Sequence, residues 1–211
     1  MFFQKDYVLR MIEMMGDLMR RIKELMDDLS RLKLLEDACH RHCGISLDTA
    51  EHLTSGSLID LLPPMPRLMM SEILFVRANT FSLAMEEREE LLYKSLRLMA
   101  SLWSEGPLCE LRASRLVELK ETLLARLSTE DLMDCARFFC EGEAYGHMED
   151  ALFQAVEGMD AGSDRRSALI TQGAEMLRKA SAATPEALAF SGCTRQELLA
   201  SALELEAAGQ G

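Results

Sequence analysis

A chain of 211 residues is long enough for one or two domains with a buried core, and 48% hydrophobic with 27% charged residues is a globular composition. The net charge of −12 opposes binding to phosphate backbones, and no basic stripe offsets it, so nucleic acid is not an expected partner. No run approaches the roughly 18 apolar residues that span a bilayer, so no membrane association is expected.

The residue usage predicts an all-α fold. There are 36 Leu and 15 Met but only 10 Val plus Ile. Unbranched side chains lose little rotamer freedom in a helix, whereas β-branched ones lose more. We therefore predict a long N-terminal amphipathic helix followed by an array of antiparallel helical hairpins.

The first predicted element, residues 1–43, is one amphipathic helix that favours association. Its apolar residues alternate spacings of three and four, as in a heptad series that continues through Leu29 and Leu32. The predicted association interface consists of Val8, Met11, Met15, Leu18, Ile22 and Leu25. The stripe fits packing on the chain's own body and packing on a second subunit equally well.

Residues 44–66 form the second predicted segment, a broken linker region with one or two short helices. Gly44 begins it, and Pro63, Pro64 and Pro66 mark its end, because proline removes a backbone donor and disfavours helix in the residue before it. A helical-hairpin body over residues 67–211 follows, with a helix break near residues 82–86.

Capping sequences place several helices of that body. Ser128 with Asp131 and Thr194 with Glu197 have the spacing of capping boxes. Pro185 stands at a favoured first helical position. On the apolar stripes of these helices we expect aromatic core anchors at Trp103, Phe138, Phe139, Phe153 and Phe190.

The segment 132–157 resembles a tetratricopeptide hairpin. Leu132, Cys135, Ala136 and Phe139 fall at the spacings of the first helix in that family, and Tyr145, Met148, Leu152 and Ala155 at those of the second. The stretch 91–99 is similar to another second helix. The matches do not recur at the family's period of about 34 residues. The resemblance implies a tetratricopeptide-like superhelix, and an irregular helical bundle is the alternative.

The opening, residues 3–13 (FQKDYVLRMIE), resembles the start of an uncharacterised family of small all-helical bacterial proteins, a domain of unknown function. The resemblance covers most of the chain. It implies a bacterial cytosolic setting and no particular activity.

One cluster has the composition of a metal site. Cys39, His42 and Cys43 would share one helix face at i, i+3 and i+4, and zinc accepts both ligand types. No second Cys/His pair follows at the spacing of a zinc finger. Burial of the two thiols in the core is the alternative, and we expect neither a metal nor a cofactor.

Catalysis is not expected either. Motifs for a nucleophile elbow, a phosphate loop, a dinucleotide fold and a zinc protease are absent. Glu143 and His147, four residues apart beside a glycine turn, have the groups for acid–base chemistry, but a solvated acidic loop explains them as well.

These observations lead to one leading hypothesis and one alternative. We expect a cytoplasmic, non-enzymatic protein–protein interaction or scaffold module that self-associates as a dimer through its N-terminal helix. A basic protein or peptide partner would suit its acidic body. The alternative is a metal-binding protein that uses Cys39, His42 and Cys43.

Overall fold

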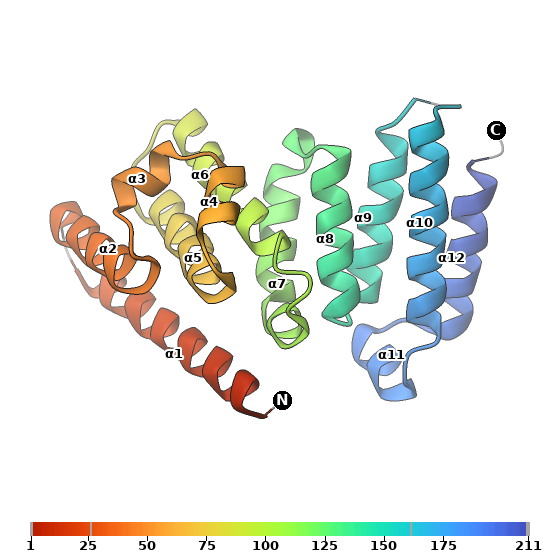
Figure 1. The fold of residues 1–211 in the computed structure, drawn as a ribbon, viewed down its shortest axis with the longest axis horizontal. Coiled ribbons are helices and arrows are strands. Elements are labelled where there is room, and N and C mark those ends of the chain that lie inside the picture. Colours follow the sequence, from red (N-terminus) through yellow and green to blue (C-terminus); the bar gives the residue numbers. More distant parts are fainter. Residues whose placement is uncertain (1, 26, 161, 210–211) are drawn as a thin grey trace. The chain divides into compact units, whose positions relative to one another are not determined.

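The computed structural model describes residues 2–25, 27–160 and 162–209, and over these residues the protein is all-α, as predicted. It contains twelve α-helices and one short 3₁₀ helix (Figure 1). In chain order they are α1 (Phe2–Glu24), α2 (Asp28–Cys43), α3 (Leu47–His52), α4 (Ser55–Leu61), α5 (Pro64–Thr80), α6 (Met85–Ala100), α7 (Gly106–Leu123), η1 (Leu124–Arg126), α8 (Thr129–Glu141), α9 (Tyr145–Glu157), α10 (Asp164–Ser181), α11 (Pro185–Ser191) and α12 (Arg195–Ala207).

The chain divides into two compact units. Unit 1 comprises Met1–Leu102 with Glu121–Leu123, and unit 2 comprises Trp103–Lys120 with Leu124–Gly211. The prediction placed boundaries at residues 44 and 66, with the proline run between a linker and the helical-hairpin body. Both of these positions lie inside unit 1. The prolines instead begin α5 inside unit 1, where Pro64 takes the first helical position and needs no intrahelical donor.

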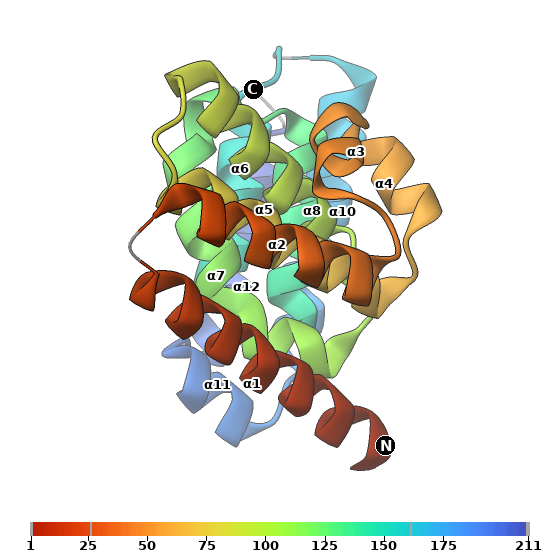
Figure 2. The same ribbon diagram turned by 90° about the vertical axis from the view of Figure 1, so that its left-hand side faces the viewer.

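The prediction of a single helix over residues 1–43 is wrong, because the structure has two helices there (Figure 2). The chain leaves the helix after Glu24 and re-enters it at Asp28. Asp27 is the N-cap of α2, with φ −120° and ψ 145°, and its carboxylate accepts a hydrogen bond from the Ser30 amide at 2.8 Å. An aspartate in this position supplies the partner that the first amides of a helix lack, so it favours a new start.

The core of unit 1 is built on the α5–α6 hairpin, against which α1, α2 and α4 also pack. Ser71 and Ser95 let the two helices approach closely, since both are fully buried and carry small side chains. Each hydroxyl donates to the other residue's carbonyl at 2.8 Å. The polar groups at this crossing are therefore satisfied without water.

The short helix α3 is held on this hairpin by charged groups. The Arg77 guanidinium of α5 donates to the Glu51 carboxylate at 2.9 Å, and the Lys94 ammonium of α6 donates to the Glu51 carbonyl. Both cations are largely shielded from solvent, so the pairing fixes the position of α3 more firmly than a surface ion pair would.

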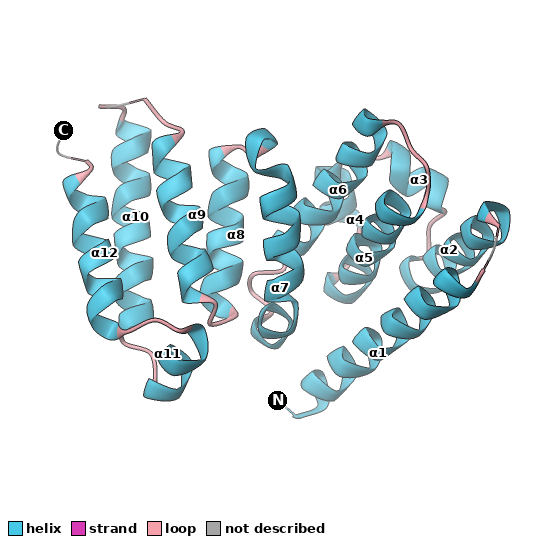
Figure 3. Cartoon of the chain, turned by 180° about the vertical axis from the view of Figure 1, so that it is seen from behind, coloured by secondary structure: helices cyan, strands magenta, loops and turns pink. Residues whose placement is uncertain are grey.

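Unit 2 consists of helical pairs, as the hairpin prediction requires. In Figures 1 and 3, α8, α9, α10 and α12 lie side by side, and α8 packs against α9 as α10 packs against α12. A Cβ on Gly173 of α10 would lie 2.7 Å from Leu205 Cδ2 of α12. Because glycine has no side chain, the two helices can approach closely there. The tetratricopeptide resemblance itself stays a prediction.

The capping predictions for unit 2 are confirmed. The Ser128 amide donates to the Asp131 carboxylate at 2.9 Å, and the Thr194 amide donates to the Glu197 carboxylate at 2.8 Å. Each N-cap hydroxyl in turn accepts from the third helical amide, which completes a capping box.

The aromatic predictions are confirmed only in part. Phe138 and Phe139 are fully buried, and their rings meet edge to face with centroids 6.5 Å apart. Phe153 is half-buried. Trp103 and Phe190 are not core anchors, since 40% and 73% of their surfaces are exposed.

Candidate functional site

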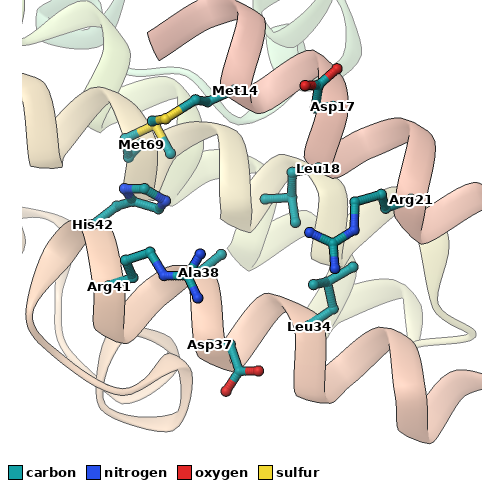
Figure 4. A pocket seen from close by; sticks show the side chains of 10 residues that line it. All are labelled: Met14, Asp17, Leu18, Arg21, Leu34, Asp37, Ala38, Arg41, His42 and Met69. Carbon is teal, nitrogen blue, oxygen red and sulfur yellow. The ribbon is translucent and has the colours of Figure 1, made fainter.

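A hollow in unit 1 runs between α1 and α2, and we call it the helix groove (Figure 4). Both helices pack on α5 rather than on one another. Met69 of α5 is therefore left at the floor between them. The groove has a volume of about 360 Å³. It is lined by Met14, Asp17, Leu18, Arg21, Leu34, Asp37, Ala38, Arg41, His42 and Met69.

A second hollow of about 320 Å³ extends the groove toward the turn between the two helices. The two hollows share Arg21, Leu34 and Asp37. The extension adds Glu24, Leu25, Ser30 and Lys33. The two hollows therefore adjoin one another between α1 and α2.

The floor and the rim of the groove differ in chemistry. Leu18, Ala38 and Met69 form an apolar floor and are themselves buried. Figure 4 shows the guanidinium groups of Arg21 and Arg41 reaching from the two helices toward the middle of the groove. No ion pair within the described part of the chain engages either of them. An apolar floor below unpaired cations is a surface that a complementary partner segment can bury.

The groove also contains carboxylates and a histidine. Asp37 lines both hollows, and Figure 4 shows its carboxylate directed away from the guanidinium groups of Arg21 and Arg41. Asp17 is paired with Arg20 on its own helix. Partial burial, with the nearby Arg41 guanidinium, lowers the pKa of His42 below its usual value. His42 is therefore neutral at pH 7, and Arg21 and Arg41 supply the positive charge over the floor.

The predicted association residues lie mainly inside the protein. Met11, Met15, Leu18 and Ile22 of α1 are buried, and Leu25 is half-buried after the end of the helix. The side chain of Val8 lies outside the described part of the structure. The stripe thus faces the chain's own interior, which is one of the two alternatives that the sequence left open. Pairing with a second subunit stays a prediction.

The Cys/His cluster is divided between two surroundings. Cys39 is fully buried, with its sulfur 4.0 Å from the Met70 sulfur, and Cys43 Sγ lies 3.4 Å from the Pro66 carbonyl. His42 lines the helix groove instead. Among the described residues, no group of three His, Cys, Asp or Glu side chains is arranged to hold a metal ion.

The acidic residues around the α8–α9 turn are engaged in separate contacts. Glu141 pairs with Lys179 at 2.8 Å, and Glu149 accepts from the Ser201 hydroxyl at 2.6 Å. The His147 ring lies 5.7 Å from the ring of Phe139. The contacts of Glu141 and Glu149 tie neighbouring helices of unit 2 together.

Four of the six thiols, those of Cys43, Cys109, Cys140 and Cys193, are poor nucleophiles. Burial, together with the Glu141 and Glu105 carboxylates, raises the pKa of Cys109 to about 12. Burial also raises the pKa values of Cys140 and Cys193, and a hydrogen bond with Cys39 raises that of Cys43. Because the thiolate is the reactive form, these shifts lower the reactivity of the four side chains at neutral pH.

The buried phenol of Tyr145, at the start of α9, makes the stability of the protein depend on pH. Burial and the carboxylate of Glu143 raise its pKa from 10.0 to about 12. Between about pH 10 and pH 12 the folded protein keeps a proton that the unfolded chain loses, so this group's contribution to stability falls as pH rises through that window. We expect Tyr145→Phe to lose less stability between about pH 9 and pH 11 than the wild type, in urea titrations at each pH. Parallel losses in the two proteins would contradict the assignment.

A wider hollow in unit 2 is a weaker candidate. It has a volume of about 640 Å³ and lies at the start of α8 and the end of α9. Three of its polar groups already have partners: Ser128 is bound in its capping box, Glu130 pairs with Arg165, and Gln154 accepts from Lys120. These three groups gain less from a ligand than Arg21 and Arg41 of the helix groove, which have no ion pair among the described residues.

Comparison with known proteins adds no relative. No family model matches the chain, and no curated protein and no solved structure matches it either. Among the described residues, no helix combines the length and the apolar content needed to cross a membrane. The helix groove is therefore the feature of the protein from which a function is inferred.

The groove residues Arg21, Leu34 and Arg41 were not predicted as a site. A single straight helix over residues 1–43 has no groove, so its residues could not be brought together across one. The available signal was the pair Asp27 and Ser30, which has the spacing of an N-cap and its bonded amide.

Proposed function

We propose that this protein is a non-catalytic interaction module that holds an amphipathic helix of a partner protein in the helix groove. The observation that carries the proposal is the helix groove between α1 and α2, in which an apolar floor lies below Arg21 and Arg41, and neither cation has an ion pair among the described residues. Helices commonly bind in such grooves through apolar side chains at i, i+3, i+4 and i+7.

The charges define the partner helix further. Residues 1–43 contain eight Lys or Arg and eight Asp or Glu, so the rest of the chain carries the whole excess of −12. The segment that forms both walls of the groove is therefore neutral, whereas the rest of the chain repels a carboxylate. Arg21 and Arg41 favour a partner helix whose apolar stripe is flanked by acidic residues. The basic partner expected for the acidic body is a separate prediction.

We also propose the cytosol as the setting of this module. All six cysteines are unpaired. Free thiols persist in reducing compartments, whereas secreted proteins of this cysteine content commonly form disulfides.

Displayed helical peptides test the groove. We expect selection on the full chain to yield amphipathic peptides with acidic flanks. Leu34→Arg should weaken their binding at least tenfold, or about 1.4 kcal/mol, because it places a charge on the apolar wall. Leu29→Arg is the matched control, since Leu29 lies on the same helix but is 78% exposed and outside the groove.

Circular dichroism of both variants would confirm that they keep the wild-type helicity. Arg41→Glu, a surface substitution that spares the floor, should weaken the same peptides through like-charge repulsion. Peptides that bind all four proteins equally, or that lose affinity for Leu29→Arg as much as for Leu34→Arg, would refute the groove as the binding surface.

A further inference from the structure

Three sulfur atoms meet in the core of unit 1, where α2 packs on α5. The Cys39 thiol donates to the Met70 sulfur at 4.0 Å, and the Cys43 thiol forms a hydrogen bond with the Cys39 thiol. Cys39 and Met70 are fully buried, and 9% of the Cys43 surface is exposed. The sequence pattern joined the two cysteines with His42, whereas in the structure the third side chain beside their sulfur atoms is a methionine.

This set of donors favours one class of metal ion. Thiolate and thioether sulfur atoms are soft ligands, and together they select Cu(I) over the harder divalent ions. A structural zinc site takes four ligands from cysteine, histidine and carboxylate side chains. Here the Met70 thioether is the third donor, and His42 lies in the helix groove instead. The donors therefore suit a soft monovalent ion of low coordination number.

The spacing of the sulfur atoms fits three-coordinate binding. Three sulfur atoms that each lie about 2.3 Å from a metal in one plane are about 4 Å from one another. The separation of 4.0 Å between Cys39 Sγ and Met70 Sδ has this value before any ion is bound. Cys39 and Cys43 are four residues apart on α2, so their thiols share one face of that helix.

The end of α2 gives an ion a short route to these sulfur atoms. Cys43 is the last residue of the helix, and Gly44 follows it in the left-handed conformation with φ 74°. Helix ends open at a lower cost in free energy than helix interiors. An ion can therefore reach Cys43 first, without the separation of α2 from α5.

The binding step exchanges protons for metal. The hydrogen bond with Cys39, together with burial, raises the pKa of Cys43, so this thiol is protonated at pH 7. Binding breaks the S–H bond of each cysteine, forms two bonds between sulfur and the metal, and releases two protons to solvent. The Met70 thioether binds through a lone pair and releases nothing.

We propose that Cys39, Cys43 and Met70 form a binding site for one soft monovalent metal ion, Cu(I) or Ag(I). The two thiolates supply the stronger bonds, and the thioether completes the coordination. The proposal does not depend on what the helix groove binds.

Competition for Cu(I) against a coloured chelator tests the site on the reduced full chain, without oxygen. We expect the wild type to withdraw one Cu(I) ion per chain from the chelator. Met70→Leu should weaken binding roughly tenfold or more, because it removes the thioether and nearly conserves the side-chain volume. Cys39→Ser should weaken binding roughly a hundredfold or more, because it removes a thiolate.

Two substitutions in unit 2 are the matched controls. Met148 of α9 and Cys135 of α8 are fully buried as well, so Met148→Leu and Cys135→Ser make the same chemical changes away from the proposed site. Both variants should bind Cu(I) like the wild type. Circular dichroism would confirm that each variant is folded, and Met70→Leu decides the question if Cys39→Ser is not.

Each contrary outcome overturns the proposal. A wild type that withdraws no Cu(I) would show that the three sulfur atoms only pack the core. Equal affinities of the wild type and Met70→Leu would exclude the thioether as a ligand. Equal weakening by Met70→Leu and Met148→Leu would trace the effect to repacking of a core and not to a lost ligand.

Discussion

The Phe139→Ala variant is expected to lose about 3–5 kcal/mol of unfolding free energy, the largest effect of any substitution considered for this protein. The Phe139 ring is fully buried in unit 2, edge to face with Phe138 and beside His147 of α9. Its removal leaves a cavity where α8 meets α9, which the two helices fill only in part. Urea unfolding followed by circular dichroism measures the loss.

Phe190→Ala is the matched control for this prediction. The same atoms are deleted in the same unit, but 73% of the Phe190 surface is exposed. We expect a change within about 0.5 kcal/mol, as at an ordinary surface site. Losses of similar size in the two variants would contradict the packing described for unit 2.

The Gly142→Ala variant is expected to lose about 1–3 kcal/mol for a steric reason. Gly142 follows α8 with φ −89° and ψ 9°, a conformation open to any residue. A Cβ there would lie 2.8 Å from the carbonyl carbon and oxygen of Cys109. Backbone atoms cannot rotate away as a side chain can, so α7 or the end of α8 must shift.

Gly158→Ala separates this clash from the general effect of replacing a glycine. Gly158 follows α9 in much the same way, but the nearest atom to its Cβ would be the Gln154 carbonyl oxygen at 3.7 Å. We expect no loss, or a small gain from the stiffer unfolded chain. Urea midpoints that fall equally in both variants would show that the approach to Cys109 is not what makes glycine necessary.

Local signals in the sequence were sufficient to predict where several helices of the body begin. Residues such as Ser128 with Asp131, or Thr194 with Glu197, act within one helical turn, so their spacing alone identifies a helix start. The all-α fold follows likewise from residue usage. These are the features that depend least on which segments meet in space.

The errors arose where periodicity was taken as evidence of burial. The heptad spacing of the first helix continues through Leu29, but the chain bends before α2 begins, and Leu29 is 78% exposed while Leu35 and Cys39 further along α2 are buried. Phe190 falls on an apolar stripe in the same way and is exposed. Spacing places a side chain on a face, and only the packing of neighbouring helices decides whether that face is covered.

The helix groove could not be predicted from the sequence, because it depends on how helices pack and not on the spacing of residues. Arg21 and Arg41 lie on helices that the sequence suggests are one, and Met69 comes from a third helix later in the chain. No spacing rule connects them. Their meeting depends on the bend after Glu24 and on the packing of α1 and α2 against α5.

Hydrogen exchange of the full chain, with and without a selected acidic-flanked helix, tests the central claim most directly. We expect slower amide exchange in α1 and α2 beside the groove, around residues 14–21 and 34–42, and no change in α8 to α12. The Leu34→Arg variant should show no protection at the same peptide concentration. Protection confined to unit 2, or protection of α1 and α2 that survives Leu34→Arg, would contradict the helix groove as the binding surface.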